Sequence, residues 1–168
     1  MKDALIDLRS HDLQIALLQP QIAPNTGNIG RLCAASACAL HLVRPMGFVL
    51  SDRALRRSGM DYWKQLNVTV HDSTEQFLKA MAHRRLWLFD SSGQTGIWDV
   101  QFRDGDVLVF GSETRGIDPA LLQACPSQVI RIPQLSGQRC LNLASAVAIA
   151  TYEALRQLHA LQLIRCRT

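Results

Sequence analysis

The sequence predicts an α/β protein in which a mostly parallel sheet carries helices on both faces. First, short apolar segments typical of buried strands alternate with helical patterns along the chain. Second, polar turns follow three of the expected strands, which is where ligands bind in such folds. Third, no internal repeat, low-complexity segment or linker interrupts the pattern. A single domain over residues 13–168, preceded by an N-terminal extension over residues 1–12, is therefore expected.

The expected elements follow from apolar runs and from helix-capping residues. Helices are expected over residues 29–39, after Ser51, from the capping-box pattern at 72–75 to about His83, over 119–125, and from near Asn142 onward. In the last helix, apolar residues recur at helical spacing from Leu143 to Leu161. Strands are expected at 13–18, 40–43, 67–70, 86–89, 107–110 and 129–132.

Composition and charge narrow the class of protein. The longest apolar run, around residues 144–150, is too short to span a bilayer, and the N-terminus lacks the apolar core of a signal peptide. A cytoplasmic protein without a membrane segment is expected. The five cysteines are an odd number without an export signal, which predicts free thiols, and no cysteine–histidine set suggests a metal. The net charge of +4 favours an anionic partner.

The first candidate for chemistry is the stretch from Pro24 to Arg31, which follows a strand and opens a helix. Gly27 and Gly30 would let the backbone approach a ligand closely, and Asn25 or Thr26 would cap the helix. Arg31 is expected in the first helical turn, where the helix dipole disfavours a cation, so it suggests a task such as holding a phosphate. The alternative is a structural loop with Arg31 in a salt bridge.

The second candidate is the turn from Gly111 to Gly116, directly after an apolar strand. Its glycine spacing is that of a phosphate-binding loop, but the Lys-Ser/Thr pair that should follow is absent. Glu113 also stands where a phosphate cradle would avoid an anion. The turn therefore fits a ligand without phosphates, and S-adenosylmethionine, whose sulfonium is cationic, is one. The alternative is an ordinary turn between a strand and a helix.

The third candidate runs from Ile132 to Ser145 and leads into the last helix. Pro133 ends a strand, a polar loop follows, and Asn142 can cap the helix. Backbone amides of this loop could read the edge of an adenine. Capping alone explains Asn142 equally well.

A separate group of basic residues lies between the first two candidates. Arg53, Arg56 and Arg57 share one face of a helix, with aromatic residues nearby in the sequence. Cations mixed with aromatic rings suit a nucleic-acid backbone with unstacked bases. The alternative is a solvated helix face.

Taken together, these segments resemble the three motifs of the SPOUT superfamily of knotted RNA methyltransferases. The closest match is the TrmL family of tRNA (cytidine/uridine-34) 2′-O-methyltransferases. The resemblance covers residues 13–158, nearly the whole chain. It is carried by the stretches PNTGNIGRLCA, RPMGF, LRRSGMDYW, GSETRGI and RIP…RCLNLASAVAIATYEA, which match in order and spacing.

The resemblance implies a C-terminal trefoil knot, a homodimer, and S-adenosylmethionine as the methyl donor for the wobble ribose in the tRNA anticodon loop. It implies no metal. On the reaction side it implies Asn25, Arg31, Glu113 and Asn142. Main-chain groups of a second set of residues would hold the cofactor: Phe89, Gly111, Ile132, Cys140, Leu141 and Leu143. Cys140 stands where the family usually has Ser.

Arg31 is not expected to act as a catalytic base, because an arginine side chain stays protonated in proteins. We expect Arg31 to hold the phosphate beside the target ribose, with Glu113 orienting Arg31 or Asn25. Two other classes compete with this interpretation. One is a tRNA-binding protein that has lost catalysis. The other is a nicotinamide oxidoreductase, against which the missing G-x-G-x-x-G motif counts.

Overall fold

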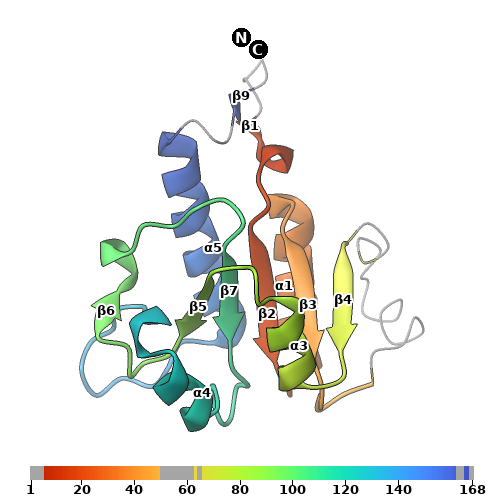
Figure 1. Ribbon diagram of the computed structural model, residues 1–168, viewed down its shortest axis with the longest axis vertical. Coiled ribbons are helices and arrows are strands. Elements are labelled where there is room, and N and C mark those ends of the chain that lie inside the picture. Colours follow the sequence, from red (N-terminus) through yellow and green to blue (C-terminus); the bar gives the residue numbers. More distant parts are fainter. Residues whose placement is uncertain (1–5, 50–62, 64–65, 162–164, 167–168) are drawn as a thin grey trace.

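The computed structural model of the chain describes residues 6–49, 63, 66–161 and 165–166 (Figure 1). A seven-stranded sheet with only parallel pairings forms its centre, in the order β4-β3-β2-β7-β5-β8-β6. Its strands are β2 (Gln14–Leu18), β3 (Ala39–Val43), β4 (Val68–His71), β5 (Leu86–Phe89), β6 (Thr95–Gly96), β7 (Val107–Phe110) and β8 (Val129–Arg131). The short strands β1 (Ile6–Asp7) and β9 (Arg165–Cys166) pair antiparallel outside the sheet.

Helices cover both faces of the sheet, as the alternation of patterns predicts (Figure 1). One core lies between the sheet and helices α1 (Ala23–Ser36) and α5 (Leu143–Ala160). The other lies between the sheet and the shorter helices α3 (Thr74–Ala80) and α4 (Pro119–Ala124). Three 3-10 turns complete the described elements: η1 (Leu8–Ser10), η3 (Ile97–Asp99) and η4 (Pro126–Gln128).

Helix α1 departs most from the sequence prediction. It begins at Ala23, six residues before the expected start, because Pro24 in its first turn is compatible with helical backbone. Its N-cap is Ile22, whose side chain makes no capping bond, so neither Asn25 nor Thr26 is the cap. Arg31 consequently lies in the middle of the helix and not in its first turn. Arg31 therefore does not oppose the helix dipole, and the prediction of a ligand-binding role on that ground is wrong.

The other helix starts are closer to expectation. Ser73 caps α3 by accepting a hydrogen bond from the Gln76 N–H, and Gln76 accepts one from the Asp72 N–H. The capping pair is thus one residue further along the chain than the predicted pair, and the helix ends at Ala80, before His83. Asn142 caps α5 as predicted, accepting from the N–H groups of Ala144 and Ser145.

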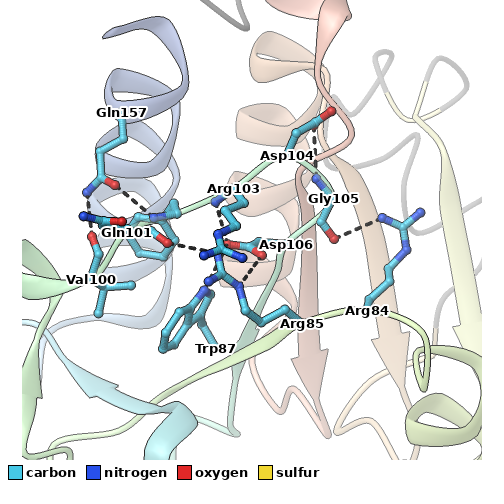
Figure 2. A network of polar contacts seen from close by, with 11 residues as sticks. Arg84, Arg85, Trp87, Val100, Gln101, Arg103, Asp104, Gly105, Asp106 and Gln157 are labelled. Atoms are coloured by element: carbon cyan, nitrogen blue, oxygen red, sulfur yellow. Dashed lines mark hydrogen bonds and ion pairs between the residues drawn. The ribbon is translucent and has the colours of Figure 1, made fainter. Parts of the chain in front are cut away.

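The amino ends of β5 and β7 are joined by one buried carboxylate, that of Asp106, which is 2% exposed (Figure 2). It accepts two hydrogen bonds from the Arg85 guanidinium, at 2.8 and 2.6 Å, one from the Trp87 indole at 3.0 Å and one from the Arg103 N–H at 2.8 Å. Four charge-assisted bonds offset the cost of burying this anion. Nearby, Gln157 ties α5 to the segment before β7 through Val100 and Phe102.

The described cysteine thiols are free, as the cysteine count predicts. Cys33 of α1 and Cys38 are both buried in the core. Burial raises the pKa of the Cys33 thiol, and it raises that of Cys38 to about 11. Both side chains therefore stay protonated and act as small apolar packing groups.

A hydrogen-bonded pair of buried histidines joins three neighbouring strands on the α3 side of the sheet. His41 Nδ1 lies 3.0 Å from His71 Nε2, and His41 Nε2 lies 2.9 Å from the Gln14 side-chain oxygen. Burial, and then the neighbouring His71 and Arg84, lower the pKa of His41 to about 4, against the weaker opposite effect of Asp12. Burial also lowers the pKa of His71, in spite of Asp72 beside it.

This pair predicts that the protein loses stability between about pH 6.5 and pH 4. The unfolded chain takes up a proton at His41 near pH 6.5, whereas the folded chain resists it until about pH 4. The free energy of unfolding should therefore fall by about 3 kcal/mol across that window. Urea unfolding of the wild type and of His41→Gln, measured from pH 7.5 to 4.5, checks this. Equal pH slopes for both proteins would contradict it.

Candidate active site

The three candidate segments lie at the carboxyl edge of the sheet, because each follows a parallel strand: β2 and β7 are neighbours, and β5 separates β7 from β8. Helix α1 follows β2, the turn from Gly111 to Gly116 follows β7, and the segment of residues 132–142 follows β8 (Figure 1). The loop after β5, residues 90–94, lies between the last two. This edge is opposite the end that Asp106 ties together.

Three of the four predicted reaction-side residues form one hydrogen-bonded cluster. The Asn142 side-chain amide donates to the Asn25 side-chain oxygen at 3.0 Å. The Asn25 amide in turn donates to Glu113 Oε1 at 2.9 Å. The contacts join residues 117 and 88 positions apart in the sequence. One polar chain thus links α1, the turn after β7 and the start of α5.

Glu113 also supplies the cap that α1 lacks locally. Its carboxylate accepts hydrogen bonds from the backbone N–H groups of Gln21, at 2.8 Å, and Ile22, at 3.2 Å. An anion at the N-terminus of a helix is stabilised by the helix dipole and by the unpaired N–H groups there. Burial raises the pKa of Glu113, but the hydrogen bonds from Gln21, Asn25 and Ile22 outweigh it and hold that pKa below its ordinary value. Glu113 is therefore ionised at neutral pH.

Arg31 is set apart from Asn25 by the geometry of helix α1. It lies six residues after Asn25 on α1 and is exposed. Six residues of α-helix advance about 9 Å along the axis and leave the two side chains about 120° apart around it. Within one chain, Arg31 and Asn25 therefore point in different directions.

A cavity of about 370 Å³ lies beside the cluster, at the carboxyl ends of β5 and β8. Of the predicted cofactor residues, Ile132 and Cys140 line it. Its volume falls within the range of small-molecule sites. Three further lining residues, Pro133, Gln134 and Gln138, belong to the third candidate segment. Sequence reasoning missed only the lining residues Ser91 and Arg131, which carry no motif of their own.

The other predicted cofactor residues lie at the same edge of the sheet. Phe89 ends β5, and its ring stacks on Phe110 with 4.6 Å between centroids. Gly111 follows Phe110 and is buried. Leu141 is 38% exposed, and Leu143 is the first residue of α5. Only main-chain groups of Phe89 and Gly111 are available to a ligand, since the side chain of one is buried and the other has none.

The glycines of the first two motifs have packing roles that the sequence did not reveal. A Cβ on Gly111 would lie 2.0 Å from the Gly116 carbonyl carbon, because Ser112 and Gly116 pair their backbones and close the turn tightly. A Cβ on Gly30 would lie 2.6 Å from the Trp63 ring. Gly30 therefore allows α1 to pack against Trp63, which is a different role from the expected approach to a ligand.

The predicted RNA-binding residues Arg53, Arg56 and Arg57 lie outside the described residues. Among the residues that the structure describes, no group of three or more His, Cys, Asp or Glu side chains could hold a metal ion. None of the described helices is both long enough and apolar enough to cross a membrane.

The parallel sheet, covered on both faces and with a cavity at its carboxyl edge, defines an α/β enzyme that binds a small molecule there. Comparison with known families identifies which one. Residues 12–152 match the model of the SpoU rRNA Methylase family, and the chain belongs to this family.

Individual relatives agree with this assignment. The chain is 46% identical over 147 residues to the tRNA (cytidine(34)-2′-O)-methyltransferase of Escherichia coli K12, covering 87% of this chain and 94% of that one. It is 44% identical over 145 residues to the protein of the same name from Saccharophagus degradans, covering 86% and 94%.

Solved structures agree as well. One that concerns 2′-OH methylation of C/U34 on tRNA is 41% identical, with a TM-score of 0.84, and covers 90% of this chain and 99% of that one. The SpoU methyltransferase AviRb of Streptomyces viridochromogenes, crystallised with AdoMet, shares the fold at 23% identity, with a TM-score of 0.78 and coverage of 92% and 61%.

The cluster predicts a measurable role for the charge on Glu113. Glu113→Gln keeps the side-chain shape but removes the anion at the start of α1, so the free energy of unfolding at pH 7 should fall by about 1 kcal/mol. A lowered pKa in the folded state stabilises the fold above the unfolded pKa of about 4.5, and this is lost as the pH falls through the folded value. The wild-type advantage should therefore shrink below pH 4.5 in urea unfolding.

The matched control is Asp99→Asn, which removes a carboxylate from an exposed position in the 3-10 turn η3, away from the start of any described α-helix, and should leave the free energy of unfolding within about 0.5 kcal/mol of the wild type. A wild-type advantage over Glu113→Gln that stays constant from pH 7 to pH 3.5 would show that the carboxylate charge is not what stabilises α1.

Proposed function

We propose that this protein transfers a methyl group from S-adenosylmethionine to the ribose 2′-hydroxyl of the wobble nucleotide of tRNA, cytidine or modified uridine at position 34. The observation that carries this is the Asn25–Glu113–Asn142 cluster beside a cavity of about 370 Å³. The assignment of the substrate is supported by relatives named for this reaction, which match over 86–87% of the chain. The substrate nucleotide lies in a single-stranded loop, which RNA-binding proteins recognise readily.

The residues around the cavity fit this cofactor. Gly111 and the segment of residues 132–142 offer main-chain groups at the carboxyl edge, without the lysine that a phosphate loop requires. We assign the main-chain groups of the predicted set to the adenine and methionine parts: Phe89, Gly111, Ile132, Cys140, Leu141 and Leu143. Because the assigned group at Cys140 is the backbone, its departure from the family's usual Ser is tolerated. S-adenosylmethionine supplies a methyl group carried on a sulfonium.

The reaction side positions the ribose hydroxyl. Each of the amides of Asn25 and Asn142 has two N–H groups and donates one of them within the cluster. Among the described residues the second N–H of each amide has no acceptor, so it is assigned to the substrate. Ionised Glu113 holds Asn25 in place. Most of the rate gain of such a transfer comes from aligning hydroxyl and methyl group. Arg31 points away from Asn25 within one chain, so the clamp that holds the adjacent phosphate and stabilises the developing alkoxide is Arg31 of a second copy of this chain.

A transfer assay with methyl-labelled cofactor tests the proposal. The purified protein should label tRNA taken from a strain that lacks this gene, and mass mapping should place the methyl group on the ribose of nucleotide 34. The same tRNA with a 2′-deoxyribose at position 34 is the control and should stay unlabelled, because the accepting oxygen is absent. Labelling elsewhere in the tRNA, or wobble methylation that persists in that strain, would overturn the assignment.

The clamp role of Arg31 is examined in the same assay. Lysine keeps the charge of arginine but loses its two-pronged hydrogen bonding. Arg31→Lys should therefore transfer methyl groups at least about tenfold more slowly, a loss of 1.4 kcal/mol in transition-state binding. Activity near that of the wild type would rule out a bidentate clamp.

We also propose that the chain is knotted. Strand β8 lies between β5 and β6, which are joined by the loop of residues 90–94. A Cβ on Gly93 in that loop would lie 2.7 Å from the Ile130 carbonyl carbon, so the loop passes tightly over β8. This crossing supports threading of residues 132–142 through the loop as a trefoil knot. The domain, residues 13–168, would work in the cytoplasm, where its tRNA substrate is used.

Homodimer formation is the remaining part of the proposal. The outer face of α5 exposes large apolar side chains, with Ile149 43% and Tyr152 52% exposed one helical turn apart. Leu141, 38% exposed, lies just before the helix on the side of the active site. A second copy packed on this face would cover these residues and lie next to the carboxyl edge of the sheet, where the candidate segments meet.

Light scattering after size exclusion tests the dimer. The wild type should show twice the chain mass of 18.7 kDa, and Ile149→Asp should shift it toward the monomer, because the charge would be buried without a partner. The control is Trp98→Asp, which places a charge on a residue of η3 that is 73% exposed. A monomeric wild type, or equal effects of both variants, would contradict an interface on α5.

A further inference from the structure

Asp90 lies between the cavity and the turn that carries Glu113, yet it belongs to neither of the predicted residue sets. It follows β5 directly, and its backbone N–H donates to the Ile130 carbonyl at 3.0 Å. Arg131, the residue after Ile130, lines the cavity. Ser91, the residue after Asp90, also lines it. On the other side, the Asp90 Oδ2 atom lies 3.4 Å from where a Cβ on Gly116 would be.

The Asp90 carboxylate is held in place by only one of its two oxygens. Oδ1 accepts hydrogen bonds from the Ser92 N–H at 2.9 Å and from the Ser92 hydroxyl at 2.7 Å. Within the described part of the chain, Oδ2 accepts none, and Asp90 takes part in none of the four ion pairs. The side chain is half-buried. A carboxylate oxygen that accepts no hydrogen bond, on a side chain held in place through its other oxygen, is available to a cation that a ligand supplies.

We propose that Asp90 is a cofactor-binding residue whose free oxygen faces the sulfonium of S-adenosylmethionine and thereby distinguishes the cofactor from its spent product. This rests on the proposed function. The cofactor carries a positive charge on sulfur, and a half-buried carboxylate next to the cavity residue Ser91 attracts it more strongly than one in water. Gly116 has no side chain to separate the carboxylate from the turn after β7.

The charge balance of the transfer explains the use of such a contact. The ribose oxygen forms a bond to the methyl carbon, the carbon–sulfur bond breaks with its electrons on sulfur, and the hydroxyl proton is released to solvent water. The sulfur of the product, S-adenosylhomocysteine, is neutral, so its attraction to Asp90 is lost. The contact therefore favours binding of fresh cofactor and release of the spent one. Because it stabilises the ground state more than the transition state, it does not raise kcat.

Calorimetric titration with S-adenosylmethionine and with S-adenosylhomocysteine tests this assignment without measuring activity. Asp90→Asn keeps an oxygen that can accept from Ser92 but removes the charge. Its Kd for S-adenosylmethionine should rise about tenfold, which corresponds to 1.4 kcal/mol. The Kd for the neutral product should change less than about twofold, because its sulfur carries no charge for the carboxylate to attract. Asp72→Asn, which removes an exposed carboxylate paired with Arg44 at the end of β4, is the matched control and should change neither value.

Two results would overturn the assignment. An equal loss of affinity for both ligands would place Asp90 against a group that they share, such as the ribose hydroxyls or the amino group. Unchanged affinity for both would show that Asp90 only shapes the turn at Ser92. If Asp90→Asn fails to fold, Asp90→Ser serves the same comparison. A wild type that binds neither ligand would refute the proposed function itself, which is a different result from either of these.

Discussion

The hydrogen bonds to the Glu113 carboxylate hold together the segments at the carboxyl edge of the sheet. The carboxylate receives two backbone N–H groups at the start of α1 and the side-chain amide of Asn25, which in turn receives Asn142 at the start of α5. Each bond is of ordinary strength. Together they fix the relative positions of three segments that follow three different strands, and they do so with an anion that the helix dipole stabilises. A site that must align two reacting groups needs this kind of rigid support.

The opposite end of the sheet is organised by the same chemistry for a different purpose. Asp106 is almost fully buried and satisfies its charge with Arg85, Trp87 and the backbone of Arg103. No oxygen is left for a ligand, so its role is to hold the amino ends of β5 and β7 together. Asp90, at the carboxyl end of β5, keeps one oxygen without a hydrogen bond in the described structure. Asp106 therefore has a structural role, whereas Asp90 has an oxygen available for binding.

Helix α1 begins earlier than its sequence predicts, and this changes the surroundings of Arg31. The stretch PNTGN contains proline and glycine and predicts a loop, but it forms the first turns of the helix. Its unpaired N–H groups are satisfied by Glu113, which is 91 residues away from Ile22 in the sequence. Once the helix begins at Ala23, Arg31 is two turns inside it and loses its supposed conflict with the dipole. Its proposed role as a clamp then depends on its exposure and on the family resemblance.

The sequence alone was sufficient for the α/β class, the strands from β2 to β8 other than the two-residue β6, and the cap of α5 at Asn142, because these depend on apolar runs and on contacts within a few residues. The ordered motifs also predicted Asn25, Glu113 and Asn142 as reaction-side residues, but could not give their hydrogen-bond partners. Only the tertiary structure decided that the three are hydrogen-bonded to one another, that Gly30 makes room for Trp63, and that Asp90 faces Gly116. The physical reason is that parallel strands bring the segments after them to one edge, and contacts between such segments leave no periodic trace in the chain.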